Sequence, residues 1–139
     1  GFLSGLAKLG TKVRPPLGFR GKLEGSIDIK KNGLVPIQNL ARYYSFASGI
    51  TAASTLERLI AVRDVVGESV ESERVLREAF VSMQHLQLRH HAHRLRNGLP
   101  LDNVIETWTL QPLTRVSLQE ALREVISAQK RFKPVEASR

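Results

Sequence analysis

A helical apolar pattern that runs from Pro36 almost to the end of the chain constrains the fold more than any other feature. Proline suits the first turn of a helix, where its missing N–H leaves no hydrogen bond unmade. After Pro36, apolar residues recur every three or four positions, which is the spacing of one helix face. Gly49 closes this stretch, since glycine readily takes the left-handed conformation that ends many helices. The apolar positions are Ile37, Leu40, Ala41, Tyr44 and Ala47.

Two more helices follow this one. Ser54 and Glu57 have the spacing of a capping box, so the second helix is predicted to begin there and to end at Gly67. Ser69 is placed to cap a third helix that runs to Arg96. At about 1.5 Å per residue, this third helix is on the order of 40 Å long.

The third helix carries two apolar stripes, and the fourth helix begins at Pro112. Because the second stripe is rotated around the helix axis, we expect the two stripes to contact different partners. Trp108, just before the fourth helix, is expected to plug one end of the core. The first stripe contains Leu76, Phe80, Met83 and Leu86, and the second contains Leu88, Ala92 and Leu95.

Four helices with short or moderate connections predict an all-α fold, an antiparallel four-helix bundle with a short N-terminal helix, loop and strand segment. Phe2–Leu9 fits two helical turns, and Pro15 and Pro16 mark the loop. Ile27 and Ile29 alternate with polar residues, as in a strand. So short a strand cannot form a sheet alone, and we expect it to join strands elsewhere.

The composition limits the classes of function. The chain has 139 residues, enough for one domain with one core. It contains no cysteine, which excludes disulfides, thiolate nucleophiles and cysteine zinc sites and fits a cytoplasmic location. No apolar run reaches the roughly 18 residues of a membrane span. The formal charge of +8 suits nucleic acid, nucleotides or another acidic partner, and it equally suits a solvated surface.

The densest basic stretch, HLQLRHHAHRLRNG, begins at His85. His90 and His93 share a helix face, but a zinc site needs a third ligand and no acid lies within a turn, so we expect no metal site. Arg89 and His93 resemble the arginine–histidine pair of HEPN-type ribonucleases, but their spacing is shorter than that motif allows. We expect His91 to point inward as a hydrogen-bonded polar group of the core.

Two other short patterns suggest chemistry. A Gly-Ser dipeptide stands before Asp28, as in nucleotidyltransferases, but the paired aspartates that hold two metal ions in those enzymes are missing. We therefore expect no catalytic residue in this chain. Thr55 and Arg58 stand at the start of a helix, a position that suits phosphate or carboxylate recognition. Simple helix capping is the alternative for this pair.

Seven segments follow one another along the chain: PPLGF, GSIDIKKNGLVPIQNLAR, GITAASTLERL, LREAF, LQLRHH, NGLPLDN and LTRVSLQEALREVI. This series resembles the nucleotidyltransferase substrate-binding domain that ends bacterial signalling proteins. In that family, the helical domain follows a catalytic nucleotidyltransferase domain and often CBS or cyclic-nucleotide-binding modules. The resemblance covers about Arg14 to Phe132. Asp28–Ile37 is also similar to the K-x-G-G-L-x-x-I junction of glutamine synthetase adenylyltransferases and PII uridylyltransferases, with Asn32 in place of the first glycine.

The resemblance implies a division of the chain into residues 1–33, a junction with an upstream nucleotidyltransferase domain, and residues 34–139, the helical substrate-binding domain. Asp28 and Lys31 would lie at the junction. Mg²⁺ and a nucleoside triphosphate would be bound by the upstream domain, with no cofactor in this chain. The residues that we expect to meet a phosphate or an acidic substrate are Lys30, Arg42, Thr55, Arg58 and Arg89.

We therefore expect the acceptor-binding domain of a bacterial signal-transduction nucleotidyltransferase, without catalysis of its own. Its expected partners are the upstream catalytic domain and an acidic protein or phosphate-bearing acceptor, with no membrane involved; a homodimer is left open. One alternative is a regulatory protein-interaction bundle without a transferase role. The other, which we favour less, is a basic domain that binds nucleic acid through its third helix.

Overall fold

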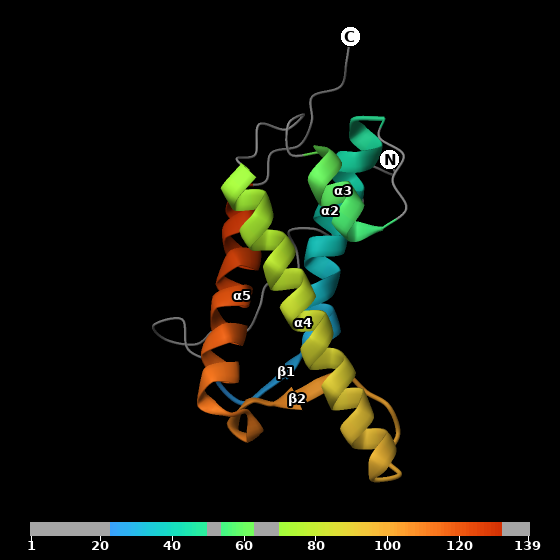
Figure 1. The fold of residues 1–139 in the computed structure, drawn as a ribbon, viewed down its shortest axis with the longest axis vertical. Helices are drawn as coiled ribbons and strands as arrows, with labels where there is room; N and C mark the ends of the chain where they lie inside the picture. Colours follow the sequence, from blue (N-terminus) through green and yellow to red (C-terminus); the bar gives the residue numbers. More distant parts are fainter. Residues whose placement is uncertain (1–22, 50–53, 63–69, 132–139) are drawn as a thin grey trace.

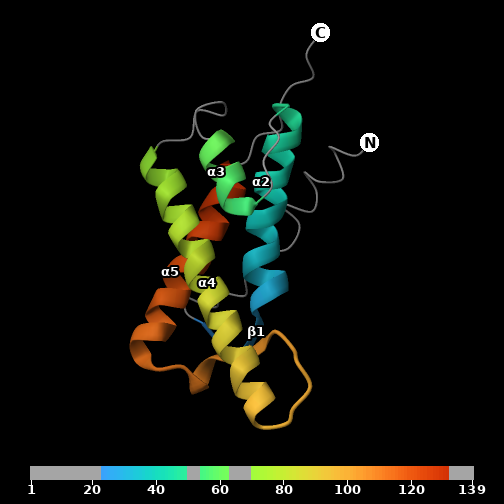
Figure 2. The same ribbon diagram turned by 45° about the vertical axis from the view of Figure 1, so that its right-hand side comes forward.

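The computed structural model describes residues 23–49, 54–62 and 70–131. These residues form four α-helices and a two-stranded ribbon (Figure 1). The helices are α2 (Val35–Ala47), α3 (Thr55–Val62), α4 (Val70–Arg96) and α5 (Pro112–Arg131). The long α4 runs antiparallel to both α2 and α5, and the short α3 packs beside α2 (Figures 1 and 2). The predicted all-α bundle is confirmed.

The first apolar stripe of α4 forms the centre of the core. Phe80 and Met83 are buried, and they belong to one hydrophobic cluster with residues of α2 and α5 such as Ile37 and Leu122. Full burial of such a side chain contributes about 1.5–3 kcal/mol. This cluster therefore accounts for the way the three long helices pack together.

The ends of the helices agree with most of the predicted signals. The backbone N–H of Glu57 donates to Ser54 Oγ at 3.2 Å, so Ser54 caps α3. Gly49 has φ +69° just beyond the end of α2, and Pro112 is the first residue of α5. The predictions for Phe2–Leu9, Gly67, Ser69 and Phe132 lie outside the described residues.

The strand prediction was right for Ile27 and wrong for Ile29, which has helical backbone angles and directly precedes η2. Strand β1 (Ser26–Asp28) pairs antiparallel with β2 (Val104–Glu106), and Ile27 lies opposite Ile105. Both isoleucines of the predicted strand are buried in the core of this same chain. The partner was missed because β2 is only three residues long and has no recognisable alternation of its own. The division of the chain at residue 33 stays a prediction.

The first long helical stretch begins at Lys30 rather than at Pro36. Its first turn, η2 (Lys30–Leu34), has the wider π-helical geometry and runs directly into α2. Asp28 Oδ1 accepts a hydrogen bond from the Lys31 N–H at 2.9 Å, and the Asp28 N–H donates to Asn32 Oδ1 at 3.2 Å. This reciprocal pair satisfies backbone donors where the helix starts. Asp28 therefore has a structural role at the junction between strand β1 and helix η2.

The expectation for Trp108 was wrong, and the expectation for the second stripe of α4 stays a prediction. Trp108 does not plug the core: it lies in the short 3₁₀ turn η3 (Thr107–Thr109) and is 74% exposed. The buried residues at this end are Ile105 and Thr107. The second stripe of α4 finds no cover among the described residues, since Leu88 is 63% exposed. The last two turns of α4 extend past the ribbon, and none of the other helices that the structure describes packs on their outer side (Figures 1 and 2).

Among the described helices, none combines the length and the apolar character that crossing a membrane requires.

Candidate functional site

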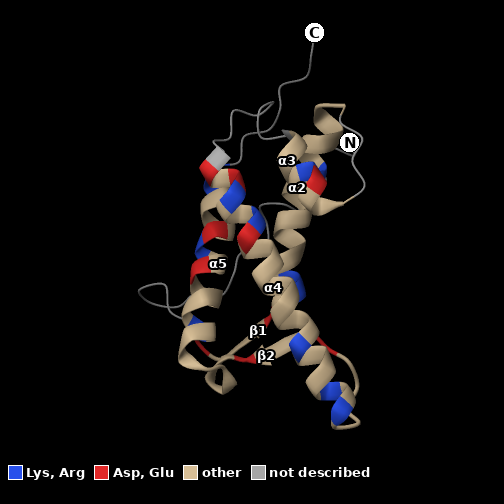
Figure 3. Cartoon of the chain, viewed as in Figure 1, with Lys and Arg blue, Asp and Glu red and all other residues tan. Residues whose placement is uncertain are grey.

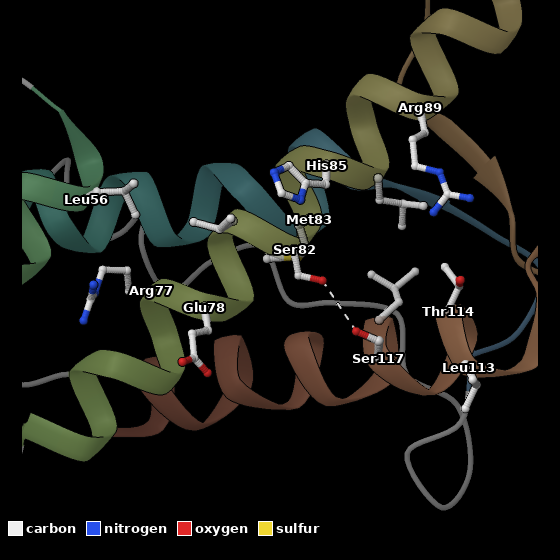
Figure 4. Close-up of a pocket in the computed structure, with 13 residues that line it drawn as sticks. Leu56, Arg77, Glu78, Ser82, Met83, His85, Arg89, Leu113, Thr114 and Ser117 are labelled. Carbon is white, nitrogen blue, oxygen red and sulfur yellow. Dashed lines mark hydrogen bonds between the residues drawn. The ribbon is translucent and has the colours of Figure 1, made fainter.

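Two adjoining cavities follow one side of α4. The first, of about 640 Å³, lies between α4 and α5, and Leu56 of α3 lines its far end (Figure 4). Its middle is crossed by a contact of 3.5 Å between the hydroxyl oxygens of Ser82 and Ser117. Arg89 and Thr114 lie at the opposite end from Leu56 (Figure 4). Most of the remaining lining is apolar.

The second cavity, of about 920 Å³, is bordered by the last turns of α4 and by the segment from Asp102 to Thr114. Leu86, Arg89 and Thr114 line both cavities, so the two are direct neighbours. We call the combined depression the α4 groove. Its first part is largely apolar, and its second part contains the basic end of α4 (Figure 3).

Asp102 organises part of the second cavity. His90 Nε2 lies 2.7 Å from Asp102 Oδ1, and Arg94 Nη1 lies 3.3 Å from Oδ2. Because a carboxylate only accepts hydrogen bonds, His90 Nε2 carries the proton in this contact. The hydrogen bond from His90 lowers the pKa of Asp102 below its ordinary value, with smaller contributions from the Val104 N–H and from the charge of Arg94. The side chains of His90 and Arg94 are thus both paired with the carboxylate of Asp102.

Asn103 holds the segment that follows α4 in place through hydrogen bonds to α4 and to Ile29. Its side-chain oxygen accepts hydrogen bonds from Gln87 Nε2 at 2.8 Å and from His91 Nε2 at 3.0 Å. Its backbone carbonyl accepts the N–H of Ile29 at 2.8 Å. His91 is therefore a hydrogen-bonded, half-buried side chain, but its partner belongs to the connection and it is not enclosed by the core. Through Asn103, the wall of the second cavity is joined to both α4 and the start of η2.

Arg89 and Arg96 differ from Arg94 in their surroundings. Both are exposed on α4 and line the second cavity. Within the described part of the chain, neither has an ion-pair partner. No Asp or Glu occurs in the sequence between Glu78 and Asp102. The second cavity therefore has two cations that are available to a ligand.

The structure does not gather the five substrate-binding residues predicted from the sequence. Lys30 is exposed in the first turn of η2, and Arg42 is exposed on α2. Thr55 is the first residue of α3, where it is half-buried. Of the five, only Arg89 lines either part of the α4 groove.

Arg58 lies on α3 with its guanidinium carbon 5.6 Å from the centroid of the Phe46 ring. This distance suits a cation–π contact, which links α3 to α2. The predicted junction residues Asp28 and Lys31 are joined by the capping hydrogen bond at the start of η2, and Lys31 is exposed.

Three groove residues were not predicted as site residues. Arg96 belonged only to a basic stretch, His93 was considered as a metal ligand and as a ribonuclease-like partner of Arg89, and Asp102 was not singled out. The spacing of Arg89, His93 and Arg96 was the available signal, because residues four and three apart share a helix face. Among the described residues, no three His, Asp or Glu side chains are grouped as metal ligands would be.

A comparison with known protein families matches residues 1–134 to the family described as "Putative nucleotidyltransferase substrate binding domain". No curated protein and no solved structure matches the chain. The family match covers nearly all of the 139 residues. It agrees with the resemblance carried by the short segments and with the helical fold. The chain therefore belongs to the nucleotidyltransferase substrate-binding domain family.

Proposed function

We propose that this chain binds the acceptor of a nucleotidyl transfer in the α4 groove and holds an anionic group of that acceptor with Arg89 and Arg96. The family supplies the general role, substrate binding beside a nucleotidyltransferase. The groove supplies a place for it. The chain positions the acceptor, and the neighbouring catalytic part performs the chemistry.

The observation that carries this proposal is the contrast between the arginines of the second cavity. Arg94 is paired with Asp102 at 3.3 Å, whereas Arg89 and Arg96 have no carboxylate partner among the described residues. Arginine binds carboxylate and phosphate groups through two parallel N–H donors. Cations that line a cavity without an internal partner are therefore suited to an anionic ligand.

In this proposal, the catalytic groups and the cofactors belong to the neighbouring nucleotidyltransferase part. Nucleotidyl transfer through two metal ions needs several carboxylates around the ions. Such a ligand group is not found among the described residues of this chain. We therefore assign Mg²⁺ and the nucleoside triphosphate to the catalytic part, and we place the whole protein in cytoplasmic signalling of bacteria.

Lys30, Arg42, Thr55 and Arg58 have a different place in this proposal. They lie on η2, α2 and α3, away from the lining of the α4 groove. We propose that they contribute to the surface that meets the catalytic part. The proposed surface also includes Asp28 and Lys31. It therefore comprises the start of η2, the exposed side of α2 and the start of α3.

The proposal is tested by titrating the ¹⁵N-labelled chain with inorganic pyrophosphate and with a short oligoglutamate peptide, and following the amide resonances. We expect the largest shifts in α4 from Arg89 to Arg96 and in the segment from Asp102 to Thr109. Arg89→Ala and Arg96→Ala should each weaken binding by about tenfold or more, because a hydrogen bond to a charged group contributes about 1.5–3 kcal/mol.

Lys130→Ala is the matched control, since Lys130 is an exposed cation near the other end of α5. It removes one positive charge without touching the groove. Equal weakening by Lys130→Ala would show a general charge effect and would contradict the proposal. Shifts confined to α2 and α3 would contradict it as well, because they would place the anion site on the other surface.

A further inference from the structure

Leu88 and Leu95, with the half-buried Ala92 between them, form an apolar row on α4. Their spacing of four and three residues puts them on one side of the helix. Leu88 is 63% and Leu95 is 65% exposed, although other leucines of this chain are buried in its core. Met83, which is fully buried, lies on the other side of this part of α4. We call these three residues the leucine row.

A second row runs beside the first, one residue further along the chain. Arg89, His93 and Arg96 repeat the same spacing of four and three, so this basic row is parallel to the leucine row. All three line the second cavity of the α4 groove. Gln84 and His91, on the other edge of the leucine row, provide no permanent charge. The surface is thus apolar along its centre and cationic along the one edge that borders the groove.

We infer that the acceptor is a protein and that it docks through an acidic amphipathic helix. Its apolar residues lie on the leucine row, and its carboxylates meet the basic row. This inference rests on the proposed function, because it names the class of acceptor that the same site takes. An amphipathic helix that docks on a protein surface contacts it through anchor residues three and four positions apart. The leucine row has the same spacing.

The shape of the surface favours a protein over a small anion. A small anion would be held by the basic row inside the cavity and would leave Leu88 and Leu95 in water. The leucines line neither part of the groove, so only a ligand that extends beyond it can cover them. An interfacial membrane helix is rich in Lys and Arg on its whole polar face, whereas the leucine row is bordered by cations on one edge. The one-sided charge favours an acidic protein partner.

The test uses the full chain and three fluorescent probe peptides of about 18 residues, which is about five helical turns. The first is an acidic helix with leucines at every third and fourth position and glutamates along the borders. The second has the same composition in scrambled order, and the third has lysines in place of the glutamates. Binding is measured by fluorescence anisotropy at two salt concentrations.

We expect the acidic amphipathic peptide to bind at least about tenfold more tightly than either of the other two. Leu88→Ser and Leu95→Ser should each weaken this binding by about tenfold, since buried apolar anchors dominate interface affinity. Arg89→Ala and Arg96→Ala should weaken it and reduce its dependence on salt. Val116→Ser is the matched control, because Val116 is exposed on α5 and lines neither part of the groove.

The outcomes separate this inference from the proposed function. If the acidic and scrambled peptides bind equally, and only Arg89→Ala and Arg96→Ala matter, the docking helix is wrong while the anion site stands. If no acidic peptide binds at about 1 mM, the docking helix is overturned. The anion site is overturned as well if inorganic pyrophosphate does not bind in the same range. Binding to phosphatidylglycerol vesicles that is lost in Leu88→Ser, without peptide binding, would replace the protein partner with a membrane surface.

Discussion

His90 and Asp102 are twelve residues apart in the chain, yet His90 Nε2 lies 2.7 Å from Asp102 Oδ1. The chain reverses at Asn97 and Gly98, where Gly98 has φ +64°, and returns along the last turns of α4. Arg94 strengthens the closure, because its Nη1 contacts Asp102 and its Nε donates to the carbonyl of Pro100. The contact shapes the second cavity and leaves Arg89 and Arg96 as its unpaired cations among the described residues.

Asp102→Asn is expected to destabilise the chain at neutral pH and to have little effect in strong acid. The pKa of Asp102 is lowered in the folded protein, chiefly by the hydrogen bond from His90. A lowered pKa stabilises the fold above the ordinary value of about 3.9, and this contribution is lost as the pH falls through the folded value. The difference in Tm between the two proteins should therefore shrink below about pH 4.

Thermal unfolding followed by circular dichroism at a series of pH values measures this difference. Asp102→Glu retains the charge and serves as the control for the change of side chain. A Tm difference that stayed constant down to the lowest pH would show that Asp102 acts through its shape alone.

Asn103→Ala is expected to lower the free energy of unfolding by about 1–3 kcal/mol, because it leaves half-buried donors of Gln87 and His91 without their acceptor. Urea unfolding of the variant and of the original chain gives the number. Gln111→Ala is the control, since Gln111 is exposed and such a change is usually within about 0.5 kcal/mol. Equal stability of the two variants would mean that Asn103 does not hold the connection to α4.

The positions of the helices could be predicted because their signals are local. The apolar spacing after Pro36, the cap at Ser54 and the proline at position 112 depend only on nearby residues. The start at Lys30 could not be predicted this way. It depends on the pairing of Asp28 with Asn32 and on the fit of Gly33 against Met83, which is distant in the chain.

The candidate site was predictable only in part, for a related reason. The concentration of bases from His85 to Arg96 is visible in the sequence. Which of them are neutralised depends on where the following connection places Asp102, and that contact is made across a chain reversal. Arg89 was predicted as a ligand residue, but the residues that line the cavity with it were not. They come from the segment before α5, which is distant from Arg89 in the sequence.

Gly33→Ala is expected to destabilise the chain by about 1–3 kcal/mol, as overpacking of a tight core does. A Cβ at this position would lie 2.6 Å from Sδ of Met83, and Met83 is fully buried, so its side chain has little room to move. The free energy of unfolding in urea measures the effect. Met83→Ala, which removes the clashing atoms, should make the two changes less than additive in the double variant. Strict additivity would show that the alanine is accommodated elsewhere.

Trp108→Ala is expected to change the free energy of unfolding by no more than about 0.5 kcal/mol, because its side chain is 74% exposed in η3. If Trp108 plugged the core, the same change would cost about 3–5 kcal/mol. Leu122→Ala is the control for a real core position, since Leu122 is fully buried on α5 and its loss should cost about 2–5 kcal/mol. Trp108 is the only tryptophan of the chain, so iodide should quench its fluorescence readily in the folded protein. Protection from iodide together with a large loss of stability would restore the plug and contradict the position of η3.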